Sequence, residues 1–450
     1  MNVRVRLLNS KPIRPQAKYV LYWAQMNRRV ESNHALAYAV ELANQHGLPV
    51  LFYEGLTFDY PYANDRFHTF LLEGMPHTEK RCHTRGLGYC FYLRKKSACG
   101  NDMLYRLAAD AAAVVTDDYP VFIAARNNRS VPARLAIPYY VVDSSCIVPM
   151  NLFEKREYGA YTIRPKIHRL LPEYLTPVDS WKVDVPFRLP LPPEHGAGAA
   201  AECDIDHGVR ASLSIQGGRV AAEKQLGEFL RTNLPRYPRE SNQPAERATS
   251  GLSPYLHFGH ISSLEVALAV KDYAAENNLI ADEFLEQLIV RRELAFNFVR
   301  HTENPESIDN LPQWALGTLK KHASDIRPSL YTRDQFEIAA THDELWNATQ
   351  NELLLTGKIH GYYRMYWGKK IIEWSRTIEE ALATMIYLHD RYALDGRDPN
   401  TYTNILWCFG LHDRPWKERA IFGMVRYMTL DGMKRKTDVE TYIRQIGELR

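Results

Sequence analysis

Three tryptophans near the end of the chain have a spacing that could serve electron transfer. Trp367 and Trp374 lie in the helical pattern HGYYRMYWGKKIIEW, seven residues apart. Seven residues span about 10.5 Å of helix, so the two indoles share one face. Trp346 lies on the preceding predicted helix. Indoles give up electrons readily, so a row of them could carry charge, although most tryptophans simply fill protein cores.

Polar residues nearby could add acid–base chemistry. His389 shares one helical face with the apolar Met385, so we expect it to point inward. Asp395 follows six residues later, and Arg364 lies one turn before Trp367, so an ion pair could link the two helices. The alternatives are a buried core histidine and a purely structural ion pair.

A basic segment near the C-terminus could bind nucleic acid. Between Pro415 and Lys436 the sequence has six basic residues against two acidic ones, with Trp416 and Tyr427 interleaved. Cations and aromatic rings suit a phosphate backbone and unstacked bases. A solvated surface helix would have a similar composition.

Bulk composition sets limits on the function. The chain has 450 residues, 45% of them hydrophobic, and a net charge of +3 with a pI near 8.4, which permits nucleic acid but does not demand it. The six cysteines form no CxxC pair, and His257 and His260 lack a third ligand at a suitable spacing, so we expect no metal site. Without an apolar leader or a long apolar run, we expect no membrane span, and a cytoplasmic protein with reduced thiols.

The first third of the chain alternates short apolar runs with helical patterns. This series is typical of an α/β domain with a parallel sheet covered by helices on both faces. No GxGxxG follows the first strand, but Thr116–Tyr119 lies at a strand end, where such sheets bind ligands. The predicted strands are 19–23, 49–53, 87–93, 113–116 and 139–142, and the predicted helices are 33–46, 66–75 and 102–112.

A linker and a helical domain follow. Prolines and then GAGAAAE mark residues 176–215 as a linker, and from residue 216 the pattern is helical almost throughout. Capping boxes are predicted at Thr341–Glu344 and Thr377–Glu380, with helix stops at Gly357 and Gly396. The predicted organisation is therefore an α/β domain (1–175), a linker (176–215) and an all-α domain (216–450).

Taken in order, the motifs resemble those of the class II DNA photolyases over nearly the whole length. The similar segments are RVRLLN, YVLYW, VVTDDYP, GGRVAAEKQLGEFL, TSGLSPYLHFGHIS, FLEQLIVRREL, ELWNATQ, HGYYRMYWGKKIIEW and DRYALDGRDPN. The resemblance implies an N-terminal antenna domain and a helical domain that binds FAD. It also implies light-driven repair of cyclobutane pyrimidine dimers in UV-damaged DNA, by electron transfer from excited, reduced FAD to a flipped lesion.

The resemblance assigns roles to individual residues. Trp374, Trp346 and Trp367 match the family's electron-transfer tryptophans, with Trp367 nearest the flavin and Trp374 nearest solvent, and Trp407 matches the aromatic residue that contacts the dimer. Helix starts bind phosphates well, which fits the TSGLS motif. The residues implied for FAD are Tyr237, Ser250, Gly251, Leu252, Ser253, Asn297, Arg364, His389, Asp395 and Gly396, and those for DNA are Trp407, Arg426, Lys434 and Arg435.

The sequence departs from the family pattern at several of these places. His389 replaces an asparagine that faces flavin N5, and could donate a proton there. Gln287 replaces a carboxyl group thought to hydrogen-bond the dimer. Ser241 replaces an arginine that enters the gap left by the lesion. Met424 replaces a lysine of the DNA face, and Phe296 replaces a polar residue.

Two functions therefore remain open from the sequence. The first is a dimer photolyase, which we expect to be a monomer and to bind FAD and a deazaflavin antenna. The second is a cryptochrome-like blue-light sensor with weak or no repair, which the substitutions favour. A plain nucleic-acid-binding module fits poorly with the flavin and tryptophan motifs.

Overall fold

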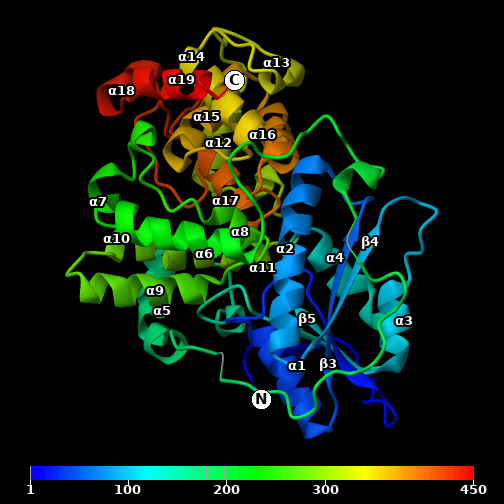
Figure 1. Cartoon of the computed structure of the whole chain (residues 1–450). Coiled ribbons are helices and arrows are strands. Elements are labelled where there is room, and N and C mark those ends of the chain that lie inside the picture. Colours follow the sequence, from blue (N-terminus) through cyan, green and yellow to red (C-terminus); the bar gives the residue numbers. More distant parts are fainter. Residues whose placement is uncertain (1, 179, 197, 450) are drawn as a thin grey trace.

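A six-stranded sheet forms the centre of the N-terminal part of the molecule (Figure 1). The computed structural model describes residues 2–178, 180–196 and 198–449. The strand order is β1-β6-β5-β2-β3-β4. The strands are β1 (Val5–Leu7), β2 (Tyr19–Trp23), β3 (Val50–Thr57), β4 (Gly88–Arg94), β5 (Ala111–Asp117) and β6 (Tyr139–Val142).

Helices cover both faces of this sheet. The inner strands are almost wholly buried, as continuous apolar runs in a two-sided sheet should be. Helices α1 and α2 pack on one face, and α3 packs on the other with the segment after α4. The helices of this part are α1 (His34–Gln45), α2 (Asp65–Thr84), α3 (Met103–Asp110), α4 (Phe122–Ser130) and α5 (Ala160–Tyr174), with turns η1 (Pro132–Arg134) and η2 (Met150–Leu152).

The predicted α/β class is confirmed, with one correction. Strands β2 and β6 have the predicted bounds, β4 is shifted by one residue, and β3 and β5 are longer than predicted. The sheet is not wholly parallel, because β1 pairs antiparallel with β6 at one edge. This strand has three residues and is only half-buried, so it has neither the length nor the apolar run that identified the others.

The predicted linker runs along the opposite edge of the sheet. Backbone N–H groups of Phe187, Gly196 and Asp204 donate to carbonyl groups of Gly86, Phe91 and Lys95, in or beside β4. The segment therefore covers an edge strand that would otherwise expose unpaired backbone groups. Within its described residues it contains one short turn, η3 (Ala200–Glu202).

The rest of the described chain is helical, which confirms the predicted class of the second part. Figure 1 shows these helices beside the sheet, from green to red. They are α6 (Arg219–Glu228), α7 (Tyr237–Glu240), α8 (Ser253–His257), α9 (Ser263–Glu276), α10 (Asp282–Leu285), α11 (Arg292–Arg300), α12 (Gln313–Lys321), α13 (Arg333–Glu337), α14 (Glu344–Thr356), α15 (Gly361–Trp374), α16 (Ile378–Tyr392), α17 (Pro399–Cys408), α18 (Leu430–Lys436) and α19 (Val439–Gly447), with π turns η4 (Phe229–Asn233) and η6 (Glu286–Arg291) and 3-10 turns η5 (Pro244–Glu246) and η7 (Ile308–Asn310).

Two of the four predicted helix boundaries are correct. The Thr377 side chain caps α16, and Gly357 ends α14 in the left-handed conformation. The other two are wrong. Asp343, and not Thr341, caps α14 by accepting a hydrogen bond from the backbone of Trp346. Helix α16 already ends at Tyr392, before Gly396.

Candidate functional site

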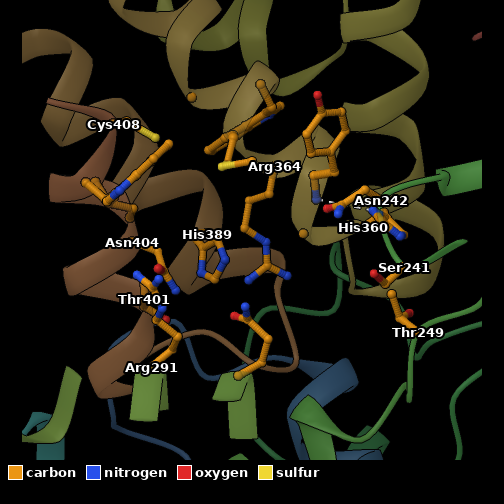
Figure 2. A pocket seen from close by; sticks show the side chains of 18 of the residues that line it. Ser241, Asn242, Thr249, Arg291, His360, Arg364, His389, Thr401, Asn404 and Cys408 are labelled. Carbon is orange, nitrogen blue, oxygen red and sulfur yellow. Dashed lines mark hydrogen bonds between the residues drawn. The ribbon is translucent and has the colours of Figure 1, made fainter. Parts of the chain in front are cut away.

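A cavity of about 680 Å³ opens among the helices of the second part. Its walls come from α7, η6, α15, α16, α17 and the loops beside α7 and α15. The cavity brings together seven residues that the sequence singled out, namely Tyr237, Ser241, Gln287, Arg364, Trp367, His389 and Trp407. Figure 2 shows Arg364 and His389 side by side in its middle, with Cys408 on one side and Asn242 and His360 on the other.

The predicted ion pair joins Arg364, which lines this cavity, to Asp395, which does not line it. Arg364 Nη2 is 3.0 Å from Asp395 Oδ2, which also accepts a hydrogen bond from Ser253 Oγ at 2.7 Å. Burial alone would raise the pKa of Asp395, but the charge of Arg364 holds it well below its usual range. The buried carboxyl group is therefore ionised. Arg364 Nε has no hydrogen-bond partner, which leaves one donor of the guanidinium free.

His389 points inward, as predicted, but it is uncharged. Burial and the nearby charge of Arg364 lower the pKa of its imidazole to about 3. At neutral pH the ring can donate only the single proton of the neutral form. The expectation that His389 could donate a proton to a flavin stays a prediction. Among the described residues, its buried Nδ1 has no hydrogen-bond partner.

Sequence reasoning missed His360, a second histidine of the cavity. Its Nδ1 accepts a hydrogen bond from the backbone N–H of Tyr362, at 3.2 Å, and so caps α15. The proton must then lie on Nε2, which is buried without a partner, and burial lowers the pKa of the ring to about 4. The signal was a histidine directly before a helix start, but histidine is not among the favoured capping residues.

The TSGLS motif lies next to the cavity. Its first residue, Thr249, lines the wall, whereas Ser250, Gly251 and Leu252 do not. Gly251 is in the left-handed conformation, at φ +69°. Gly396 also lies behind the wall, packed against His389, where a Cβ atom would come within 2.7 Å of the His389 carbonyl oxygen. The glycine thus allows the Asp395 loop to approach α16 closely.

The three predicted tryptophans form one contiguous ladder. The rings of Trp367 and Trp346 are stacked with centroids 6.4 Å apart, and those of Trp346 and Trp374 are 6.2 Å apart. Only Trp367 lines the cavity. Trp346 Nε1 donates to the carbonyl group of Trp367, and Trp367 Nε1 donates to Gln350. The order from the cavity outward is the predicted one.

The outer end of the ladder is not at the surface. Trp374 is only 2% exposed, because Tyr331 and His342 pack against its ring at 5.7 and 4.9 Å. Trp374 is still the most exposed of the three rings, as expected, since Trp346 is 0% and Trp367 1% exposed. Residues of the loops on either side of α13 cover it.

The remaining sequence-predicted residues divide between the cavity and other places. Gln287 on η6 and Ser241 after α7 line the cavity. Asn297 does not, because its amide group already bonds the backbone of Lys155 and Glu157. Phe296 is buried against Tyr119 instead of facing the cavity.

Aromatic and basic side chains surround the Trp407 end of the cavity. The guanidinium of Arg426 lies over both Trp407 and Trp416, 5.8 and 4.9 Å from the ring centroids. Lys434 and Arg435 are exposed on α18. Trp416 is 38% exposed, so this large aromatic surface is open to a partner.

The two histidines of the HFGH segment bond other groups of the protein. Among the described residues, no group of three or more potential ligands is suitably placed. His257 contacts Asp398, and His260 accepts a hydrogen bond from the backbone of Gly218. In the same residues, no helix is both long and apolar enough to cross a membrane.

A second cavity of about 630 Å³ lies where the two parts meet. Asp118–Phe122, at the carboxyl end of β5, form one wall, and Arg300 and Tyr402 come from the helical part. Asp118 pairs with Arg6 and Arg300. Phe122 has a φ of +56°, a strained conformation for a bulky residue. Parallel sheets bind ligands at this end.

Sequence comparison finds similar proteins over the full length. The family model described as DNA photolyase matches residues 20–184. The deoxyribodipyrimidine photo-lyase of Methanothermobacter thermautotrophicus is 41% identical over 447 residues, covering 99% of this chain and 98% of that protein. That of Potorous tridactylus is 36% identical over 456 residues, covering 99% of this chain and 84% of that protein.

Solved structures share the fold. A cryptochrome from Synechocystis matches with a TM-score of 0.72 and 15% identity, over 95% of this chain and 88% of that one. A class III photolyase from Agrobacterium tumefaciens matches with a TM-score of 0.68 and 17% identity, over 96% of this chain and 86% of that one.

Proposed function

Because the chain belongs to the DNA photolyase family, we propose that it splits cyclobutane pyrimidine dimers in UV-damaged DNA with light. The observation that carries this proposal is the composition of the main cavity. One side holds unpartnered polar groups around Arg364 and His389, and the other is an aromatic wall at Trp407 beside the half-buried Arg426. The assignment to class II stays a prediction.

The polar groups of the cavity fit FAD. His389 Nδ1, His360 Nε2 and Arg364 Nε are buried hydrogen-bonding atoms that have no partner among the residues that the structure describes, and such atoms usually have one. A flavin offers carbonyl, ring-nitrogen and phosphate groups that would satisfy them. When bound, a reduced flavin supplies an electron on absorbing blue light. We propose that Arg364, Asp395 and His389 orient its ring, and that Tyr237, Thr249 and His360 lie along the rest of the cofactor.

The tryptophan ladder would carry electrons from the Trp374 end to the cofactor in the main cavity. Its ring contacts continue from Trp367 in the cavity wall through Trp346 to Trp374. Backbone hydrogen bonds and close packing hold the rings in fixed positions, so little rearrangement accompanies the passage of charge. We propose that this path keeps the bound cofactor reduced.

The lesion would enter at the Trp407 end. A dimer inside a duplex is out of reach, so it must be flipped into the cavity, where Trp407 can stack on it. Arg426, Lys434 and Arg435 would hold the neighbouring phosphates. Gln287 can donate and accept a hydrogen bond at the dimer, but it cannot give a proton.

We further propose that the second cavity takes a deazaflavin antenna. Its position at the carboxyl end of β5, its aromatic Tyr119 and Phe122, and its arginines suit a planar, partly anionic molecule. Titration of the purified protein with a deazaflavin tests this. Absorbance and energy transfer to the flavin should saturate at one molecule per chain.

A light sensor without repair activity is the second candidate function. The observation in its favour is the replacement of a carboxyl group by Gln287 and of an amide by His389 within one cavity. Illumination of the reduced protein with a dimer-containing oligonucleotide separates the two functions. If the protein is a photolyase, the oligonucleotide should lose its dimers under light and keep them in the dark. If the protein is a light sensor, the oligonucleotide should keep its dimers under both conditions.

A further inference from the structure

Lys369 on α15 is a buried cation with an unexplained position. Its side chain is fully buried, and within the described parts of the chain it forms no ion pair with a carboxylate. The adjacent Lys370, in contrast, pairs with Glu373 at 2.6 Å. Burying an ammonium group without a counter-charge is costly, so such a group usually has a specific use.

The ammonium lies directly behind the aromatic wall of the main cavity. Its Nζ donates to the carbonyl oxygen of Cys408 at 2.5 Å and lies 5.2 Å from the centroid of the Trp407 ring. Both Trp407 and Cys408 line the cavity, as does Gly368. One layer of side chains separates the positive charge from the cavity, and the burial of Lys369 weakens dielectric screening between them.

The groups around Lys369 leave it charged at neutral pH. Burial lowers the pKa of Lys369 to about 8; Cys408 and then Asp413 favour the charged form, whereas Arg426 disfavours it. Burial also raises the pKa of the Cys408 thiol, and Lys369 lowers it. The carbonyl oxygen that Lys369 contacts belongs to the last residue of α17, where the helix dipole is negative.

We propose that the Lys369 ammonium stabilises the negative charge that the substrate carries during the light-driven step. This inference rests on the proposed photolyase function. The dimer gains one electron, two carbon–carbon bonds of its cyclobutane ring break, and the electron returns, so the substrate is anionic only while it reacts. A fixed cation behind Trp407 favours that short-lived state over the neutral dimer. In this proposal Lys369 does not touch the substrate. Its charge acts from behind Trp407, through the electrostatic field in the cavity.

A purely structural role would also place a donor here, because Lys369 satisfies a carbonyl group at the end of α17. Two variants separate the roles. Lys369→Gln keeps an N–H donor and removes the charge, and Lys369→Met removes both. Lys320→Gln is the matched control, since it removes one positive charge from an exposed site on α12.

The test measures dimers split per absorbed photon at saturating oligonucleotide, from about pH 6.5 to about 9.5. Each variant is first compared with the wild type for flavin content and thermal unfolding. We expect the wild-type yield to fall as the pH rises through the pKa of Lys369. Below that pH, Lys369→Gln should give a roughly three- to tenfold lower yield without this pH dependence. Lys320→Gln should follow the wild type.

Two results overturn the inference while leaving the photolyase function intact. One is a Lys369→Gln protein with the wild-type yield and pH profile. The other is a wild-type yield that does not change across the range, which decides the question even if both Lys369 variants fail to fold. A wild-type protein that splits no dimers overturns the proposed function itself, and the inference with it.

Discussion

At the scale of single residues, burial decides which groups of the cavity carry charge. Asp395 is ionised because Arg364 compensates for its burial, whereas burial and the positive charge of Arg364 keep His389 and His360 neutral. The middle of the cavity is thus lined by an arginine whose charge a buried carboxylate balances, and by neutral donors. We propose that such a site holds a polar, aromatic cofactor.

The neutral state of His389 predicts a specific pH dependence of stability. The pKa of its ring is about 3 in the folded protein and about 6.5 in the unfolded chain, so the unfolded state takes up the proton first as the pH falls. The stability that the wild type owes to a neutral His389 is present above about pH 6.5 and is lost towards about pH 3. The His389→Asn variant lacks this pH-dependent contribution to the free energy of unfolding.

Chemical denaturation of both proteins measures the effect. The free energy of unfolding of His389→Asn, minus that of the wild type, should rise by up to about 1.4 kcal/mol per pH unit as the pH falls below about 6.5. A difference that stays constant over that range would mean that His389 titrates equally in both states.

At the scale of elements, the sequence pattern predicts the individual pieces better than their contacts. The helical period correctly places Trp367 and Trp374 on one face of α15, and the apolar runs correctly locate five strands. That Trp346 from α14 lies between the two indoles depends on tertiary packing, and the resemblance suggested it. Contacts made by loop residues could not be predicted, because no local sequence pattern indicates that Tyr331 and His342 cover Trp374.

Several site features could not be predicted for the same reason. The amide group of Asn297 is used by a loop at residues 155–157, more than a hundred residues away in sequence. His360 became a candidate only when its Nε2 proved to be buried and unpartnered. Lys369 looks like one of two lysines in a helix until the structure shows which of them is paired.

The ladder between α14 and α15 predicts that removing its middle ring interrupts charge transfer. Trp346→Phe keeps an aromatic side chain in the core but removes the indole, which is easier to oxidise. Photoreduction of the bound flavin should fall to a small fraction of the wild-type rate. Trp314→Phe is the control, because Trp314 lies on α12 outside the ladder. Equal rates in the wild type and Trp346→Phe would refute the path.

At the scale of the whole molecule, the α/β part supports the loop that carries Asp395. Tyr119, after β5, donates a hydrogen bond to Asp398 at 2.6 Å, and the guanidinium of Arg397 lies 3.5 Å from the ring centroid of Phe67 on α2. Arg66 on α2 also bonds the carbonyl groups of Leu353 and Tyr392 at 3.0 and 2.8 Å. The two parts therefore hold the main cavity in shape together.

This support predicts that the contact between Tyr119 and Asp398 contributes to stability. Tyr119→Phe leaves a buried carboxylate with one donor fewer, which should cost about 1–3 kcal/mol in the free energy of unfolding. Tyr161→Phe is the control, because Tyr161 is 65% exposed. Unfolding in urea compares the two variants. A loss in Tyr119→Phe no larger than in Tyr161→Phe would show that the contact adds nothing.

The most direct test of the central claim is the number of dimers split per absorbed photon by the purified, reduced protein. A defined oligonucleotide carries one cyclobutane dimer, and a dark sample and an undamaged oligonucleotide serve as controls. We predict that dimers disappear only under light that the flavin absorbs, and that each protein molecule repairs many of them. No loss of dimers after many excitations, in a protein whose flavin is still photoreduced, would contradict the photolyase function and leave the light sensor.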